Sequence, residues 1–189
     1  MNLSNLIDNT KTDKNTTHSY LEVYEMLFKE KQNTATNILE IGIQSGGSIK
    51  LWHDYFTRAI IYGVDIQRVK NTCPEIRNKS RIILGSFDAY SKEFINNEMN
   101  KLNVKFDIMI DDGVHTLESM IFFIEKYLPM LKDDGIFIIE DVASIDWIDT
   151  LTNIVPNELK KFIDVYDLRS NKDRFDDILF VINRTKQIE

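Results

Sequence analysis

The stretch Glu40-Ile41-Gly42-Ile43-Gln44-Ser45-Gly46-Gly47-Ser48 decides the fold, because it joins an apolar run to a helical pattern through a glycine-rich turn. The run at residues 38–43 suits a strand that is buried on both faces, and residues 48–56 carry apolar side chains at helical spacing. Glycine lets the backbone turn tightly and approach a ligand closely. The stretch therefore predicts the first strand–turn–helix unit of an α/β sheet.

The same unit repeats along the chain. Short Ile- and Val-rich runs lie at residues 38–43, 60–64, 82–84, 106–110, 136–139, 162–165 and 178–182, and helical patterns at 20–28, 48–56, 90–102 and 116–131. Strand followed by helix, repeated, indicates right-handed βαβ units. The polar segment 167–177 has no clear helix, so the last two runs are expected to pair antiparallel. We predict a doubly wound, Rossmann-like sheet of seven mostly parallel strands with an antiparallel last strand. A single domain would comprise an N-terminal helical segment (1–35) and a core (36–189).

Composition narrows the class of protein. The 189 residues carry a net charge of −7, which argues against duplex nucleic acid as a partner. Cys73 is the sole cysteine, which excludes an internal disulfide and a four-cysteine zinc site. The start has no secretory pattern, and no apolar run approaches the roughly 20 residues of a membrane span. We expect a soluble cytoplasmic protein that binds neither nucleic acid nor membrane.

Ligands of such sheets bind beyond the carboxyl ends of the strands, so the residues after each run are the candidates. The glycine turn has the spacing Gly-x-x-x-Gly-Gly, which differs from the Gly-x-Gly-x-x-Gly of dinucleotide binders and favours S-adenosylmethionine over NAD. The alternative is a turn that needs glycine for packing alone. The cofactor contacts expected from this turn are Glu40, Gly42, Ser45, Gly46, Gly47 and Ser48.

Two further strand ends extend this cofactor site. Asp65 closes the next run, 23 positions after Gly42, near the roughly 20 expected for an acid that binds ribose hydroxyls. It could equally cap the following helix. Ile66 follows it, and Ser86 and Phe87 follow the third run, where adenine would lie. Phe87 could stack on the base or belong to the core.

Acidic residues follow the fourth and fifth runs, as Asp111-Asp112-Gly113 and Glu140-Asp141. Carboxylates packed at neighbouring strand ends repel one another, and a divalent cation with oxygen ligands, usually Mg²⁺, resolves the repulsion. His115 is placed to take a proton from a hydroxyl held on the metal. Asp133-Asp134-Gly135 is a similar tripeptide, but it precedes a strand, so we expect a solvated helix stop without a role in the site.

With these motifs the sequence resembles the metal-dependent sugar O-methyltransferases of the macrocin and mycinamicin type. The resemblance begins at Thr12-Asp13-Lys14 and His18-Ser19-Tyr20, and it is strongest at Asp-Asp-Gly-x-His (111–115) and Glu-Asp (140–141). It implies catalysis by His115 and Asp112, with Mg²⁺ on Asp112, Glu140 and Asp141. It also favours a cofactor contact by His18. Asp111 is expected to contact the cofactor as well.

The expected activity is methylation of a sugar hydroxyl, on a glycoside or a nucleotide-linked deoxysugar. Two alternatives stay open: a metal-dependent methyltransferase of catechol-like molecules, and a cofactor-binding subunit without turnover. Arg169 and Arg174 could meet a substrate phosphate or pair with the aspartates beside them. The chain has few insertions, so a second copy in a homo-oligomer could supply the lid.

Overall fold

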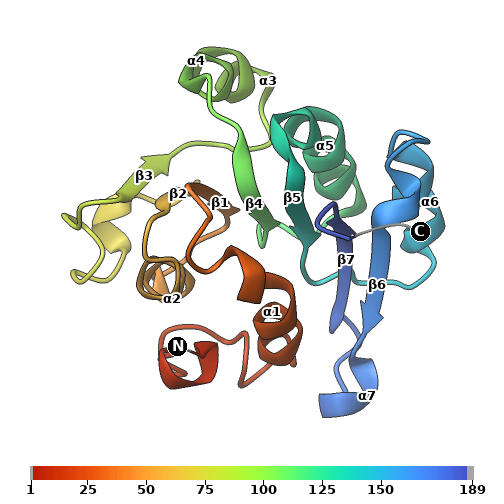
Figure 1. Ribbon diagram of the computed structural model, residues 1–189, viewed down its shortest axis with the longest axis horizontal. Helices are drawn as coiled ribbons and strands as arrows, with labels where there is room; N and C mark the ends of the chain where they lie inside the picture. Colours follow the sequence, from red (N-terminus) through yellow and green to blue (C-terminus); the bar gives the residue numbers. More distant parts are fainter. Residues whose placement is uncertain (1, 187–189) are drawn as a thin grey trace.

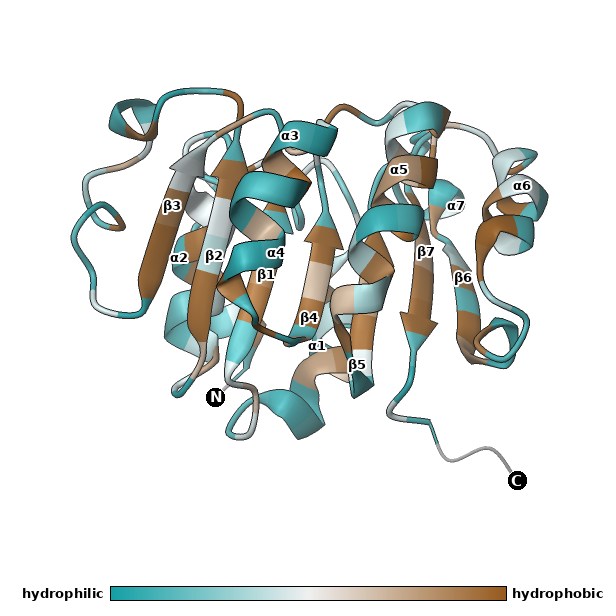
Figure 2. Cartoon of the chain, turned by 90° about the horizontal axis from the view of Figure 1, so that it is seen from above, coloured by the Kyte–Doolittle hydropathy of each residue, from teal (hydrophilic) through white to brown (hydrophobic). Residues whose placement is uncertain are grey.

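The structure is a computed structural model, and it describes residues 2–186. At its centre lies a seven-stranded sheet in the order β3-β2-β1-β4-β5-β7-β6 (Figure 1). The strands are β1 (Asn37–Ile41), β2 (Ile60–Asp65), β3 (Ile82–Ser86), β4 (Phe106–Asp111), β5 (Leu131–Ile139), β6 (Ile163–Asp167) and β7 (Ile178–Asn183). Strands β1 to β5 pair in parallel, whereas β7 is antiparallel to both β5 and β6. In Figure 2 the arrow of β7 runs opposite to that of β4. The predicted fold class is confirmed.

Helices cover both faces of the sheet. In Figure 2, α3 (Lys92–Phe94), α4 (Asn100–Leu102), α5 (Leu117–Tyr127) and α6 (Trp147–Ile154) lie in front of it, and α1 (Leu21–Phe28) and α2 (Gly47–Tyr55) behind it. The short α7 (Arg169–Lys172) precedes β7. Within residues 2–186, none of the helices is long and apolar enough to cross a membrane.

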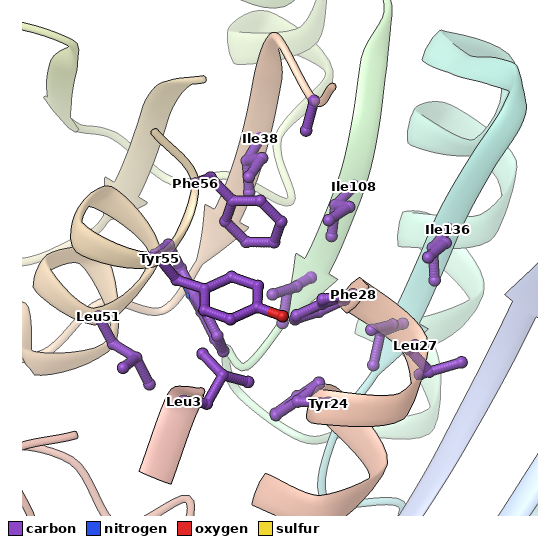
Figure 3. Packing of buried hydrophobic residues seen from close by; sticks show 14 of the residues in the cluster. Leu3, Tyr24, Leu27, Phe28, Ile38, Leu51, Tyr55, Phe56, Ile108 and Ile136 are labelled. Atoms are coloured by element: carbon purple, nitrogen blue, oxygen red, sulfur yellow. The ribbon is translucent and has the colours of Figure 1, made fainter. Parts of the chain in front are cut away.

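Side chains of the strands alternate between two cores. Ile38, Ile108 and Ile136 pack with α1 and α2, and Figure 3 shows them beside Phe28 and Phe56. Their chain neighbours, such as Leu39, Met109 and Phe137, pack on the other face with α5. Because successive strand residues point to opposite faces, this alternation also fixes where polar side chains at the strand ends are directed.

The N-terminal residues belong to the first of these cores. The turn Leu3–Asn5 buries Leu3, which lies near Tyr24 and Tyr55 in Figure 3. Residues 11–13 then reach the cavity described below, ahead of α1. The segment predicted as N-terminal and helical therefore also contributes to the edge of the sheet where ligands are expected.

Three local predictions differ from the structure. The helix expected at 90–102 is divided into α3, a π-helical turn (Ile95–Met99) and α4, and it starts after Ser91, whose side chain accepts from the backbone N–H of Phe94. The helix expected at 116–131 ends with α5 and a 3-10 turn containing Pro129, which has no N–H to donate. Asp133-Asp134-Gly135 consequently lies in β5, beside an irregularity in its pairing with β4. Helices α6 and α7 were not predicted.

Candidate active site

A cavity of about 520 Å³ lies over the carboxyl ends of the parallel strands. Its lining includes many of the predicted site residues, namely Gly42, Gly47, Ser48, Asp65, Ile66, Phe87, Asp112, His115 and Asp141. The N-terminal segment adds Lys11, Thr12 and Asp13 to this lining. Residues spread over most of the sequence therefore meet at one edge of the sheet.

The glycine turn brings the ends of β1 and β4 together. Gly42 has a φ of +82°, and a Cβ atom there would lie 1.8 Å from the carbonyl oxygen of Asp112. Gly46 also has a positive φ, +85°, but a Cβ atom on it would meet the side chain of Ile76 at 2.2 Å. Gly46 is absent from the cavity lining and serves the packing of the turn, and its contact with the cofactor stays a prediction.

Replacing Gly42 by alanine is expected to disturb the site and the fold together. A left-handed backbone and a backbone clash should cost roughly 1–3 kcal/mol of unfolding free energy. Gly135→Ala is the matched control, because its Cβ would press at 2.7 Å on the flexible side chain of Leu131. Urea denaturation followed by circular dichroism should show the larger loss for Gly42→Ala. Equal losses in the two variants would remove the special role of Gly42.

Asp65 closes the glycine turn from β2. Its Oδ2 accepts from the backbone N–H groups of Ile43 and Gln44, both at 2.9 Å, and its Oδ1 accepts from Gln67 at 2.8 Å. A carboxylate oxygen has a second lone pair, so Asp65 can still accept from a ligand in the cavity. In the structure Asp65 therefore supports the glycine turn. Its contact with ribose stays a prediction.

The residues after β3 divide between the cavity and the loops around it. The ring of Phe87 is 41% exposed and stacks on Phe94, with ring centroids 4.9 Å apart. This leaves one face available for a flat ligand. Ser86 instead accepts a hydrogen bond from the backbone of Val69, and the Ser45 hydroxyl donates to the carbonyl of Lys11. Neither serine lines the cavity, so both support the loops around it, and their contacts with the cofactor stay predictions.

Asp112 and Asp141 each have one oxygen held from behind and one directed toward His115. Oδ2 of Asp112 lies 2.7 Å from Nζ of Lys14, and Oδ1 of Asp141 accepts from the Tyr20 hydroxyl at 2.6 Å. The other oxygens lie 3.7 Å (Asp112) and 3.5 Å (Asp141) from Nε2 of His115. Burial and the charge of Asp112 raise the pKa of Asp141. The two free oxygens and the imidazole could share a metal ion, since their ligand atoms lie within 4.8 Å of one another.

Local backbone structure fixes these directions. His115 and Asp141 both adopt a left-handed conformation, with φ of 55° and 53°. Directly after His115, Thr116 begins α5 with a capping box that it forms with Ser119. The start of a well-capped helix therefore holds the turn that carries the imidazole.

Glu140 and Glu40 point to the α1 and α2 face, beneath the cavity. Glu140 is 2% exposed, and both of its oxygens contact Nζ of Lys14, at 2.6 and 2.7 Å. The Tyr24 hydroxyl donates to it as well. Glu40 is fully buried and accepts from Nε1 of Trp52 at 2.9 Å. The side chain of Glu40 does not line the cavity, because strand alternation turns it into the core, and its contact with the cofactor stays a prediction.

Charge in this interior is balanced by one lysine. Burial alone would lower the pKa of Lys14, but the charges of Asp112, Glu140 and Glu40 raise it well above its usual value. Lys14 therefore remains an ammonium ion. Burial raises the pKa of Glu40 to about 7, an effect that Lys14 opposes.

Asp111 and His18 also lie behind the cavity wall rather than in it. Asp111 is 3% exposed, points to the opposite face of the sheet, and accepts from the Tyr90 hydroxyl. Burial raises its pKa to about 7. His18 is 3% exposed, with Nδ1 at 3.3 Å from both Asp141 and Asp177. Both side chains are already engaged by neighbours at these buried positions, and their contacts with the cofactor stay predictions.

The arginines after β6 are occupied by neighbours. Arg169 pairs with Asp167 at 2.7 Å, and Arg174 pairs with Asp176 at 2.8 Å. This arrangement matches the ion-pair alternative.

The sheet order, the antiparallel β7 and the cavity over the parallel strand ends define the Rossmann-like fold of class I methyltransferases. Solved structures of methyltransferases have a similar fold. A MycE methyltransferase from the mycinamycin pathway, solved with Mg and S-adenosylhomocysteine, has a TM-score of 0.75 at 22% identity, covering 97% of this chain and 55% of that one. The N-methyltransferase NodS from Bradyrhizobium japonicum has a TM-score of 0.54 at 14% identity, covering 95% and 93%.

Curated relatives confirm the resemblance to macrocin- and mycinamicin-type sugar O-methyltransferases. Mycinamicin VI 2''-O-methyltransferase from Micromonospora griseorubida is 31% identical over 137 residues, 69% of this chain and 33% of that protein. Demethylmacrocin O-methyltransferase from Streptomyces fradiae is 29% identical, covering 69% and 33%. A rhamnosyl tetracenomycin-C 2'-O-methyltransferase from Streptomyces olivaceus is 27% identical, covering 72% and 36%. The chain thus spans about a third of the length of these relatives. No family model matches it.

Proposed function

We propose that this chain is an O-methyltransferase that uses S-adenosylmethionine and Mg²⁺ and acts on a sugar hydroxyl, in a glycoside or a nucleotide-linked deoxysugar. The observation that carries the proposal is one cavity that joins Asp65 to the free oxygens of Asp112 and Asp141 and to His115. The relatives support the acceptor class, because two of their names specify O-methylation of a rhamnosyl and an L-olivosyl compound.

The residues around the glycine turn suit the nucleoside and amino-acid parts of S-adenosylmethionine. Gly42 and Gly47 present backbone without a Cβ atom, Asp65 has lone pairs for a ribose diol, and Phe87 exposes a ring for adenine. S-adenosylmethionine would supply the methyl group.

The free oxygens of Asp112 and Asp141 suit a hard divalent cation, which commonly binds to one or two carboxylates and keeps positions for other ligands. Such a cation would favour ionisation of the acceptor hydroxyl. His115, whose Nε2 faces both carboxylates, is proposed to accept the hydroxyl proton in its neutral form. The imidazolium ion that results is stabilised by the same two acids. Glu140 is proposed as the third ligand, as the sequence predicts, and its carboxylate also contacts Lys14.

Calorimetry with S-adenosylhomocysteine tests the cofactor end of the cavity. Asp65→Ala should weaken binding by about tenfold or more, because a buried hydrogen-bonded contact and the support of the turn are both lost. Asp133→Ala, which removes an exposed aspartate from β5, is the control and should bind like the wild-type chain. Unchanged affinity in Asp65→Ala would refute the assignment.

Transfer of a labelled methyl group to a panel of acceptors tests the reaction. The proposal expects product from glycosides or nucleotide-sugars in the presence of Mg²⁺. Product from catechols alone would favour the catechol alternative, and cofactor binding without any product would favour a non-catalytic subunit. A cytoplasmic location and a homo-oligomer stay predictions.

A further inference from the structure

We propose that the loop between β6 and β7 carries a second sugar-binding subsite, in which the ring of Phe175 stacks on the sugar unit next to the one that is methylated. On this proposal, which rests on the proposed function, the acceptor is a glycan of at least two sugar units, and Phe175 is a specificity-determining residue.

The loop lies at the same edge of the sheet as the candidate active site. Because β5 and β6 are both antiparallel to β7, the carboxyl end of β6 points the same way as that of β5. Figure 1 shows α7 directly after the arrowhead of β6. A hollow of about 490 Å³ lies in this loop, and its lining consists of Asp167, Arg169, Ser170, Asp173, Arg174 and Phe175. One edge of the sheet therefore carries both the active-site cavity and this hollow.

One hydroxyl group links the loop to the metal end of the active-site cavity. The Tyr20 hydroxyl lies 2.6 Å from Oδ1 of Asp141 and 3.2 Å from the carbonyl oxygen of Asp176, the residue after Phe175. The backbone beside Phe175 is thus two hydrogen bonds away from a carboxylate that we assign to the cation. This separation suits the second unit of a glycan whose first unit presents its hydroxyl at the cation.

The active-site cavity alone leaves little room for an acceptor. Its volume of about 520 Å³ is that of a pocket for one drug-sized ligand, and S-adenosylmethionine is itself a ligand of that size. An acceptor that presents a hydroxyl to His115 must therefore extend beyond the cavity. The hollow in the β6–β7 loop supplies space for it on the side of Asp141.

The lining of the hollow suits a sugar better than an apolar group or a phosphate. Of the described residues that line it, Phe175 alone is apolar, and it is 67% exposed. Arg169 pairs with Asp167 at 2.7 Å and Arg174 with Asp176 at 2.8 Å, so donors and acceptors lie side by side and their charges cancel. Sugar hydroxyls both donate and accept, and the less polar face of a sugar ring packs on an aromatic ring. An apolar aglycone would need a more apolar lining, and a phosphate would need an excess of cations.

Phe175 projects from an anchored loop. Lys172 donates to the carbonyl oxygen of His18 at 2.5 Å, and the fully buried Asp177 accepts from the backbone N–H of Ser19 at 3.1 Å. Both contacts join the loop to the N-terminal segment that borders the active-site cavity. Because an anchored ring loses little conformational freedom when a ligand binds, its stacking contact contributes fully to the choice of acceptor.

Methyl transfer to matched acceptors tests this subsite. The probes are the methyl glycosides of rhamnose, glucose and galactose, the methyl glycoside of a disaccharide of each sugar, the octyl glycosides and the nucleotide-linked forms. The wild-type chain should have a kcat/KM about tenfold higher for its best disaccharide than for the matching monosaccharide, because the second ring adds a stacking contact. Phe175→Ala should remove this preference through KM.

Three further variants separate stacking from other effects. Phe175→Tyr keeps the ring and should keep the preference for disaccharides, whereas Phe175→Leu keeps an apolar side chain without a ring and should lose most of it. Ile83→Ala is the matched control, because Ile83 is 50% exposed in β3 and lines neither the cavity nor the hollow. Circular dichroism and calorimetry with S-adenosylhomocysteine should give wild-type results for all of these variants.

Several results would overturn the subsite and leave the proposed function intact. They are equal kcat/KM for monosaccharides and disaccharides in the wild-type chain, a disaccharide preference that survives in Phe175→Ala, and transfer to nucleotide-linked sugars alone. A preference for octyl glycosides that depends on Phe175 would assign the hollow to an apolar aglycone and would overturn it as well. Absence of transfer to every sugar of the panel would contradict the proposed function, and the subsite with it.

Discussion

Replacing Asp112 by asparagine is expected to reduce methyl transfer by about 10³-fold or more, because a cation that loses a charged ligand forfeits several kcal/mol of transition-state stabilisation. Asp141→Asn should behave alike, since its free oxygen converges with that of Asp112 beside His115. Both variants should keep their affinity for S-adenosylhomocysteine, which depends on the other end of the cavity. Steady-state methyl transfer and calorimetry on the same samples separate the two effects.

Removal of the metal ion by a chelator tests the same prediction independently of any substitution. Excess chelator should bring the wild-type chain down to the rate of Asp112→Asn, and added Mg²⁺ should restore it. Asp133→Asn is the control for a loss of negative charge far from the cavity. Full activity of the wild-type chain in excess chelator would show that the carboxylates serve some purpose other than holding a cation.

Replacing His115 by alanine is expected to cost roughly 10²–10⁴-fold in kcat/KM, the usual range for a positioned general base. The substitution removes the only side chain in the cavity lining that is proposed to accept the proton of the acceptor hydroxyl. The fold should tolerate the change, because His115 lies in a turn and contributes little to either core.

His115→Gln distinguishes a base from a hydrogen-bond donor, since glutamine can donate toward Asp112 but cannot take up a proton. His53→Gln is the matched control, because His53 pairs with Asp54 on α2 and does not line the cavity. The variant at His115 should be inactive and the control active. A near-wild-type rate in His115→Gln would assign the role of the base to another group.

Much of the fold could be predicted, because a parallel strand that is buried on both faces appears in the sequence as a short apolar run, such as Ile136 to Ile139. The boundaries of helices and strands were harder to predict. The start of β5 runs through Asp133 and Asp134, whose polarity resembles the end of a helix, and the pairing with β4 shifts register across these residues. The π-helical turn within residues 95–99 has no comparable signal in the sequence.

The site was predictable where it depends on topology. Parallel strands end at a common edge, so Asp65, Asp112, His115 and Asp141 could be grouped without a structure. The direction of Glu40 and Asp111 was available in principle from the period-two alternation of each strand.

The contacts of Lys14 could not be predicted from strand order or alternation. Its partners are 98 and 126 positions away in the chain, and no local pattern indicates that an N-terminal lysine reaches beneath the cavity. The resemblance at Thr12-Asp13-Lys14 marked the motif but not its contact. Tyr20, which is 121 positions from Asp141, was missed for the same reason.

A crystal structure of this chain with S-adenosylhomocysteine, Mg²⁺ and a glycoside acceptor tests the central claim most directly. The account predicts ribose on Asp65, the cation between Asp112 and Asp141, and the acceptor hydroxyl between that cation and Nε2 of His115. Cofactor density outside this cavity, or an acceptor hydroxyl remote from His115, would contradict it.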